Sequence, residues 1–196
     1  MGFQENFESN FQPGFQSASG VVLSRRIVGE GDLFLTLFLK GMGLTAASAR
    51  GAATGKVRFG GGTEPLVWGV FTLYRGRGEG KDGEGKRYLK SVDVADDMLK
   101  LRASARALFA AVRWAKLLTR HLPAGHPSDE LLANFYWSMK LLSEGEVSAD
   151  VLEWRFLWRW LKSWGLAPEL SEFFDCAPGE LEWLRKAAGV KATDLK

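Results

Sequence analysis

The chain of 196 residues is poor in the residue types from which most catalytic and metal sites are built. Its one cysteine, Cys176, excludes an intrachain disulfide and a four-cysteine zinc site, and it fits a reducing compartment. The two histidines, His121 and His126, are separated by Pro123 and Gly125, so we interpret them as surface residues of a loop rather than metal ligands. Without a Ser/His/Asp or Cys/His set, we expect no enzyme, no bound metal and no cofactor.

Long apolar runs are absent as well. No stretch approaches the roughly 20 consecutive apolar residues that a membrane-spanning helix needs. The N-terminus has no basic region followed by an apolar segment, which is the mark of a secretion signal. We therefore expect a soluble, cytoplasmic protein, and its 46% hydrophobic content is enough for one large domain or two small ones.

Basic charge is concentrated in the first half of the chain. Residues 20–95 carry 12 Lys and Arg against 7 Asp and Glu, a net charge of +5, whereas the whole chain has +3. An excess of this kind suits a polyanion, because each neutralised phosphate releases a counterion. The composition thus favours a nucleic-acid partner for this half.

Residues 1–19 are rich in Gln, Asn, Ser and Gly, with a phenylalanine at every fourth position from Phe3 to Phe15. Pro13 and Gly14 interrupt any helix that this spacing would form. We predict a flexible N-terminal arm over 1–19.

From residue 20 the apolar pattern has a period of two, as in Leu33, Leu35, Leu37 and Leu39, which is typical of half-buried strands. Further strands are predicted at 44–49, 66–74 and 87–94, with Gly-rich turns between them. About five short strands in this length are typical of a small closed barrel such as the OB-fold, so we predict an OB-fold domain over 20–95.

After residue 95 the pattern becomes helical. It predicts one long helix from Asp96 or Asp97 to His121, a second after Ser128, a third over 148–165 and a short last helix over 179–189. Strands followed by helices indicate an α+β chain, with a C-terminal helical bundle forming a domain over 96–196.

The segment 80–86, GKDGEGK, has the spacing of a phosphate-binding loop. Arg87 follows it where Ser or Thr would hold magnesium, and no βαβ pattern surrounds it. We interpret it as a long hairpin loop.

Basic residues around the barrel loops are the stronger signal for a nucleic-acid site, because cations on Gly-rich loops can follow a phosphate backbone without reading its sequence. The candidate DNA contacts are Arg25, Arg26, Arg50, Lys56, Arg58, Arg75, Arg77, Lys86 and Arg87. Of the aromatic residues Phe59, Phe71, Tyr74 and Tyr88, we expect at least half to be core and the others to stack on bases.

The helix over 148–165 has an apolar stripe that we expect to be core: Val151, Trp154, Leu157, Trp158 and Leu161. Its other side combines basic and aromatic residues, a chemistry suited to a peptide that is both acidic and hydrophobic. The candidate docking residues are Arg155, Phe156, Arg159, Trp160 and Lys162. Plain packing within the bundle is an equal alternative.

Several short motifs occur in the order in which the RecO family carries them. They are a Gly-Glu-x-Asp turn at 29–32, a Leu-Thr-Leu element at 35–37, Ala-Arg-Gly-Ala at 49–52, Glu-Pro-Leu at 64–66 and Leu-Tyr-Arg-Gly-Arg-Gly at 73–78. On these motifs, and on a helical remainder of similar layout, the chain resembles the RecO family of recombination mediators.

This resemblance implies an N-terminal OB-fold that binds single- and double-stranded DNA and anneals complementary strands in the RecF pathway. It further implies cooperation with RecR, docking of the acidic C-terminal tail of the single-stranded DNA-binding protein, help in loading RecA, and a nucleoid-associated location. Arg50, Lys56 and Arg58 are the best-matched DNA contacts.

Two features depart from the family pattern. Ala53, Thr54 and Gly55 replace a more basic stretch of the loop, which lowers the expected DNA affinity. Phe173 and Cys176 stand where many members begin a zinc element, and no further cysteine follows, so we expect Phe173 and Phe174 to pack where zinc would bind.

Two other functions compete with this interpretation. One is a scaffold whose Trp-rich helical domain docks acidic-hydrophobic peptide tails, with DNA binding incidental. The other is a metal-dependent nuclease that uses Asp32 or Asp93. Oligomeric state, the lining of the partner groove and the role of the Phe-rich arm are not encoded in any pattern of the sequence.

Overall fold

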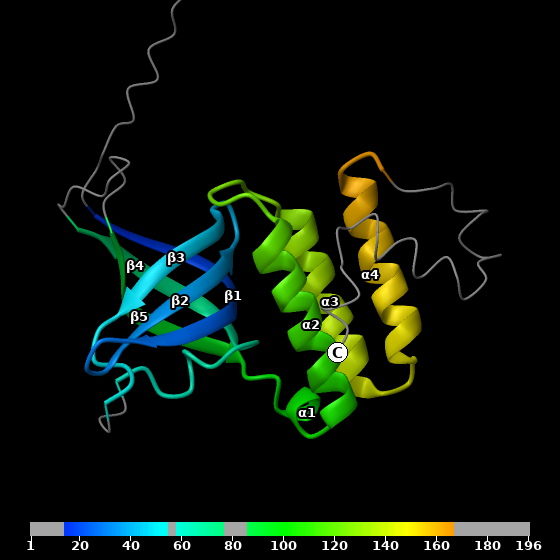
Figure 1. Ribbon diagram of the computed structural model, residues 1–196, viewed down its shortest axis with the longest axis horizontal. Helices are drawn as coiled ribbons and strands as arrows, with labels where there is room; N and C mark the ends of the chain where they lie inside the picture. Colours follow the sequence, from blue (N-terminus) through cyan, green and yellow to red (C-terminus); the bar gives the residue numbers. More distant parts are fainter. Residues whose placement is uncertain (1–13, 55–57, 77–85, 167–196) are drawn as a thin grey trace, which may run out of the picture.

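The computed structural model describes residues 14–54, 58–76 and 86–166 of the chain. Strands come first: β1 (Phe15–Val28), β2 (Asp32–Leu39), β3 (Gly43–Ala49), β4 (Trp68–Arg75) and β5 (Arg87–Asp96). Helices follow: α1 (Leu99–Arg102), α2 (Ala105–His121), α3 (Asp129–Glu144) and α4 (Ala149–Ser163). The strands form one body and the helices stand beside it (Figure 1). The predicted α+β class is confirmed.

The strands close into a barrel in the order β1-β2-β3-β5-β4. All neighbours are antiparallel except β3 and β5, which meet as a short parallel pair. The long β1 closes the barrel, because its first half pairs with β4 and its second half with β2, with an irregularity between Val22 and Ser24. This is the order of an OB-fold, as predicted.

Alternation along the strands fills the barrel interior. The four leucines of β2 at positions 33, 35, 37 and 39 point inward with Phe71, Leu73 and Leu89. Phe59 and Phe71 are buried, whereas Tyr74 and Tyr88 are on the outside, so the expectation that at least half of these four aromatics are core is confirmed.

The predicted arm over 1–19 is wrong at its C-terminal end. β1 begins at Phe15, and residues 15–19 pair with Tyr74 to Val70 of β4. The long-range ladder to β4 orders this segment immediately after the break at Pro13 and Gly14. Residues 1–13 lie outside the described ranges.

The helix predicted from residue 96 or 97 to His121 is two helices, α1 and α2. Ser104 separates them, and its hydroxyl accepts a hydrogen bond from the Ala107 N–H, which caps α2. The helix predicted to begin at Ser148 is confirmed as α4, and the Ser148 hydroxyl caps it by accepting a hydrogen bond from the Val151 N–H. The helix predicted over 179–189 lies outside the described residues. Within the described part, none of the helices is long and apolar enough to cross a bilayer.

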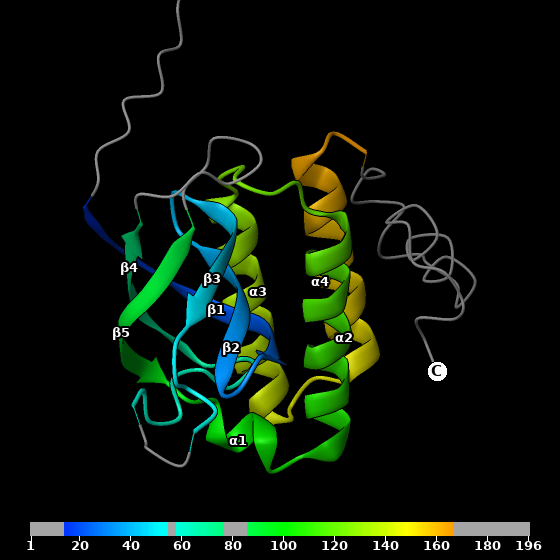
Figure 2. The same cartoon turned by 60° about the vertical axis from the view of Figure 1, so that its left-hand side comes forward.

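A shared core, separate from the cluster that fills the barrel interior, joins the barrel to the bundle. Val21, Phe38 and Leu66 of the barrel side belong to the same buried cluster as the inner faces of the helices. The Trp68 ring lies 4.8 Å from that of Tyr136 and 6.3 Å from that of Phe135. The helices accordingly cover one side of the barrel in both views (Figures 1 and 2).

Polar contacts fix this junction. The Gly41 N–H donates to the Asp129 carboxylate at 2.8 Å, and the Lys140 ammonium donates to Asp96 at 2.8 Å. Gly43 has a φ of +66°, and a Cβ there would lie 2.0 Å from the His126 carbonyl oxygen. Only glycine allows so close an approach, so the loop before α3 and the start of β3 are held together.

Candidate nucleic-acid interface

Arg50 and Arg58 lie together where β3 ends. The turn after Arg50 is fixed because the Gly51 N–H donates to the Asp32 carboxylate at 2.7 Å. Arg58 Nη1 donates to the Arg50 carbonyl oxygen at 2.8 Å, and its guanidinium lies 5.1 Å from the Phe59 ring centre. Both arginines are exposed, so the turn presents two positive charges to solvent.

Two further guanidinium groups are held over aromatic rings. Arg50 lies 4.4 Å from the centre of the Tyr88 ring, and Arg26 lies 4.6 Å from the centre of the Phe34 ring. Such contacts hold the charge in place while leaving it able to meet an anion. Arg25 differs, because it forms an ion pair with Glu64 at 2.7 Å.

The remaining predicted contacts belong to the β4–β5 hairpin. Arg75 and Arg87 are cross-strand partners and both are half-buried, whereas Lys86 beside them is exposed. Lys56 and Arg77 lie outside the described residues. We refer to Arg50, Arg58, Arg75, Lys86 and Arg87 as the loop-end cluster, since each lies next to the turn or hairpin loop at this end of the barrel.

Charge along β5 changes sign from one end to the other. Lys86 precedes the strand and Arg87 begins it at the loop-end cluster, whereas Asp93 and Asp96 lie in its last four residues. Burial alone would raise the pKa of Asp96, but hydrogen bonds from Lys140 and from the Met98 N–H outweigh it and lower that pKa. The anionic end is thus engaged with the helices, and the cationic end faces away from them.

The two candidate nuclease residues have separate surroundings. The Asp32 carboxylate accepts a hydrogen bond from the Gly51 N–H in the turn after β3. Asp93 is the cross-strand partner of Val70 in the middle of the β4–β5 ladder. Among residues 14–54, 58–76 and 86–166, no three His, Cys, Asp or Glu side chains gather in a way that could hold a metal ion.

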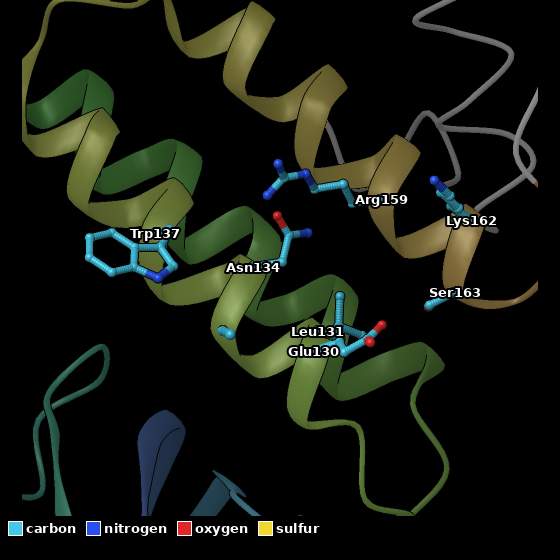
Figure 3. Close-up of a pocket in the computed structure, with 8 residues that line it drawn as sticks. Glu130, Leu131, Asn134, Trp137, Arg159, Lys162 and Ser163 are labelled. Carbon is cyan, nitrogen blue, oxygen red and sulfur yellow. The ribbon is translucent and has the colours of Figure 1, made fainter. Parts of the chain in front are cut away.

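The bundle has a groove of about 510 Å³ between α3 and α4 (Figure 3). It is lined by Glu130, Leu131, Ala133, Asn134, Trp137, Arg159, Lys162 and Ser163. The Trp137 side chain is 61% exposed. Burial, and the positive charge of Arg155, lower the pKa of Arg159, so an anion beside it would be stabilised.

Asn134 is a buried polar group at this groove. Its Nδ2 donates to the Phe156 carbonyl at 3.2 Å, while its Oδ1 has no hydrogen-bond partner among the described residues. A buried carbonyl oxygen without a donor is costly, so it is an available acceptor for an incoming N–H.

Two predicted docking residues are wrong. Phe156 and Trp160 are 0% and 1% exposed, because α2 and α3 both pack against this side of α4. The Phe156 ring lies 5.3 Å from that of Trp114 and 5.8 Å from that of Phe135. Of the other three predicted docking residues, Arg159 and Lys162 line the groove, whereas Arg155 is exposed outside it.

The expected apolar stripe of α4 is confirmed at Trp154, Leu157, Trp158 and Leu161. It is wrong at Val151, which is 58% exposed. Sequence reasoning missed Trp137 as a lining residue. The available signal was three consecutive aromatics at 135–137, because adjacent positions point in different directions on a helix and cannot all face one core.

The fold and its basic end define a class: an OB-fold barrel fused to a helical bundle, with cations gathered at the barrel loops. The family described as "Recombination protein O N terminal" matches residues 15–82. The protein named DNA repair protein RecO of Anaeromyxobacter sp. (strain K) is 32% identical over 202 residues, which cover 91% of this chain and 77% of that protein. The chain therefore belongs to the RecO family.

Other relatives carry the same name. The protein of Gloeobacter violaceus is 45% identical over 147 residues, covering 68% of this chain and 56% of the relative. That of Exiguobacterium sibiricum is 29% identical over 163 residues, covering 83% and 62%. The chain thus spans about three fifths of the length of several of the relatives that it matches.

Proposed function

We propose that this chain binds single- and double-stranded DNA through its barrel, anneals complementary strands, and acts without bond chemistry in DNA repair and recombination. The observation that carries the proposal is the loop-end cluster, in which Arg50 and Arg58 are exposed, adjacent and held by the same turn. Guanidinium groups set in this way can neutralise successive phosphates without reading bases. The family name of the relatives, a DNA repair protein, agrees with this chemistry.

The test is fluorescence anisotropy of a labelled single-stranded oligonucleotide over a salt series, with an Arg50→Ala/Arg58→Ala double variant beside the unaltered chain. Each phosphate contact contributes about 0.7 to the slope of log affinity against log salt for a single strand, so the variant should lose about 1.4 of that slope. Its affinity at low salt should fall by about tenfold or more.

A matched control removes two exposed cations from α2, by Arg106→Ala and Lys116→Ala. Net charge then changes equally, while the barrel is untouched. If the control loses as much affinity and slope as the barrel variant, charge in general governs binding and the barrel is not the site. Absence of any binding at low salt would remove DNA as a direct ligand.

Annealing is tested separately, by the rate at which two complementary labelled strands form a duplex. We expect acceleration that falls in the Arg50→Ala/Arg58→Ala variant, because neutralising both backbones lowers their repulsion. Cooperation with RecR in loading RecA onto DNA coated by single-stranded DNA-binding protein is the wider role that family membership supports, and it would place the chain at the nucleoid.

The scaffold function is supported by a different observation, the groove between α3 and α4. Trp137 offers an exposed ring, Arg159 and Lys162 offer charge, and Asn134 Oδ1 is an available acceptor (Figure 3). This chemistry fits the acidic, hydrophobic C-terminal tail of the single-stranded DNA-binding protein.

The test is anisotropy of a labelled peptide of that tail with an Arg159→Glu variant. The control Lys116→Glu makes the same charge change on the exposed side of α2. The peptide should bind the control and the unaltered chain alike and should bind the Arg159→Glu variant about tenfold or more weakly. Equal binding of the peptide to the unaltered chain, the variant and the control would mean that the tail does not bind in this groove.

A further inference from the structure

Consecutive cross-strand partners form one row around the outside of the barrel. Arg26 of β1 is opposite Phe34 of β2, which is opposite Ser48 of β3, which is opposite Tyr88 of β5. The row continues from Tyr88 to Tyr74 of β4. It ends where Tyr74 meets Phe15, near the beginning of β1. We call these six residues the aromatic row.

The row points outward along its whole length. The strand neighbours of its members, such as Leu33, Leu73 and Leu89, fill the barrel interior, and side chains alternate along a strand. Phe15 is 64% exposed and Tyr74 is 37% exposed, and their ring centres are 5.4 Å apart. Two large rings lie side by side in solvent, where packing within the barrel does not account for them.

The aromatic row has two parts, which differ in whether an arginine covers the ring. The faces of Phe34 and Tyr88 are covered by Arg26 and Arg50, whereas no arginine lies over Phe15 or Tyr74 among the described residues. One part of the row therefore carries positive charge on aromatic supports, and the other presents uncovered rings. A ligand that matches both parts has anionic groups and flat apolar groups joined in one chain.

Beyond Phe15 and Tyr74, the next row along the same strands is neutral. Ser17 and Thr72 share a hydrogen bond at 2.9 Å, and Ser91 is the β5 partner of Thr72. Acidic side chains of β5 begin only at Asp93. The Asp93 carboxylate is thus separated from the uncovered rings by this neutral row, on the side away from the loop-end cluster.

We propose that the aromatic row is a track for single-stranded DNA, with bases stacked on Phe15 and Tyr74 and phosphates held by Arg26 and Arg50. The inference rests on the proposed DNA-binding function and adds the selectivity of that site for unpaired strands. Crossing from β2 to the start of β1 takes four strand spacings of about 4.8 Å, which is roughly 19 Å. That length suits the smallest footprints of OB-folds, about four nucleotides.

Stacking on these rings distinguishes single strands from duplexes. In a duplex each base face is already covered by its neighbours, so Phe15 and Tyr74 gain nothing from it, while its phosphates still meet the arginines. Loss of the rings should therefore weaken single-strand binding alone. Loss of the arginines should weaken both.

The experiment compares the unaltered chain with a Phe15→Leu/Tyr74→Leu variant, which keeps apolar bulk but removes both rings. Affinities for a labelled oligo-dT and for a duplex of the same length are measured over the same salt series. We expect single-strand affinity to fall about tenfold or more. Duplex affinity and the salt slope should stay within about twofold, because the phosphate contacts remain.

Two controls sharpen the test. A Phe15→Tyr/Tyr74→Phe variant keeps both rings and should restore the single-strand affinity. A Val70→Ala/Val94→Ala variant removes exposed apolar groups from β4 and β5, away from the row, and should change neither affinity. A single strand containing 2-aminopurine reports stacking directly, since its fluorescence should be quenched by the unaltered chain and less so by the leucine variant.

The outcomes separate the two proposals. If the unaltered chain binds neither DNA, the DNA-binding function and the track both fail. The track alone fails if the unaltered chain binds both DNAs and the leucine variant keeps its single-strand affinity. It also fails if the leucine variant melts cooperatively but loses single-strand and duplex affinity equally. If the double variant does not melt cooperatively, the single Tyr74→Leu variant is tested instead, by comparing its affinities for the single strand and for the duplex.

Discussion

The outside of the barrel and the core of the bundle use aromatic rings in opposite ways. On the barrel, Phe34 and Tyr88 carry the guanidinium groups of Arg26 and Arg50. In the bundle, rings mainly meet other rings, as in the stack of Trp114 on Phe156 at 5.3 Å. A ring under a cation organises a surface charge, whereas a ring against a ring fills a core.

The difference extends to the two sides of the barrel. The side that faces the helices is closed by the shared core and by the Lys140–Asp96 ion pair. The loop-end cluster faces away from the helices, and Arg50 and Arg58 contact the turn itself and Tyr88 of the hairpin. We infer that one side of the barrel secures the fold and that the other is available for a ligand.

The largest effect is expected from breaking the shared core at Phe135. This side chain is 0% exposed and meets Trp68 at the barrel and Phe156 in α4. Phe135→Ala should lower the free energy of unfolding by about 3–5 kcal/mol, through lost burial and the cavity that remains. The measurement is urea unfolding followed by both far-UV circular dichroism and Trp fluorescence.

The two signals should give one coincident transition in the unaltered chain and in the variant, because barrel and bundle share their core. Trp137→Ala is the control, since it removes a larger ring that is 61% exposed two residues further along α3. Its cost should stay below about 1 kcal/mol. Two separate transitions in the unaltered chain would show that the barrel and the bundle unfold independently.

A smaller effect is expected from the ion pair at the junction. Lys140→Met leaves the partly buried Asp96 carboxylate without its ammonium partner. The expected cost at neutral pH is about 1 kcal/mol, because both groups keep some contact with solvent. Lys116→Met, an exposed lysine of α2, is the control and should cost less than about 0.5 kcal/mol.

The pH dependence of that cost follows from the two pKa shifts. The hydrogen bond to Asp96 raises the pKa of Lys140 above its ordinary 10.5, so this stabilisation is complete below 10.5 and is lost as the pH rises through the folded value. Burial opposes the shift of Asp96, but its hydrogen bonds lower that pKa below 3.8. Its stabilisation is therefore present above 3.8 and lost as the pH falls through the folded value.

The difference in unfolding free energy between the unaltered chain and Lys140→Met should hence be flat near neutrality and shrink at both extremes. A difference that stays constant from acid to alkaline pH would show that Lys140 acts through packing of its stem rather than through its charge.

The sequence predicted the parts of the fold that depend on local periodicity. Alternating leucines at 33–39 predicted β2 and its inward face, and the helical pattern from Ser148 onward predicted where α4 begins. The break before Ser104 was missed because Ala103 and Ser104 contain neither Pro nor Gly, and the apolar spacing is helical on both sides. β1 was predicted to begin too late because its first residues are ordered by β4, which is distant in the sequence.

Composition predicted which residues belong to the candidate sites, but it did not predict how those residues are arranged in space. Charge density selected Arg50 and Arg58, yet their shared turn depends on Asp32, which lies 18 residues before Arg50 in the numbering. Phe156 and Trp160 were misplaced because burial of that side of α4 depends on the packing of α2 and α3. Register across three strands, β1, β4 and β5, is what joins Phe15, Tyr74 and Tyr88, and no local pattern specifies it.

The smallest loss of stability is expected for the arginine double variant, which should show the largest loss of DNA binding. Arg50→Ala/Arg58→Ala removes two cation–π contacts, over Tyr88 and Phe59, and one hydrogen bond to a backbone carbonyl, all of them made by exposed guanidinium groups. The free energy of unfolding should fall by only about 0.5 kcal/mol, as is usual for exposed groups. The same urea titration that detects Phe135→Ala measures it. A loss above about 2 kcal/mol would mean that the arginines hold the barrel together, and weaker DNA binding by this variant would then report a damaged fold rather than a missing contact.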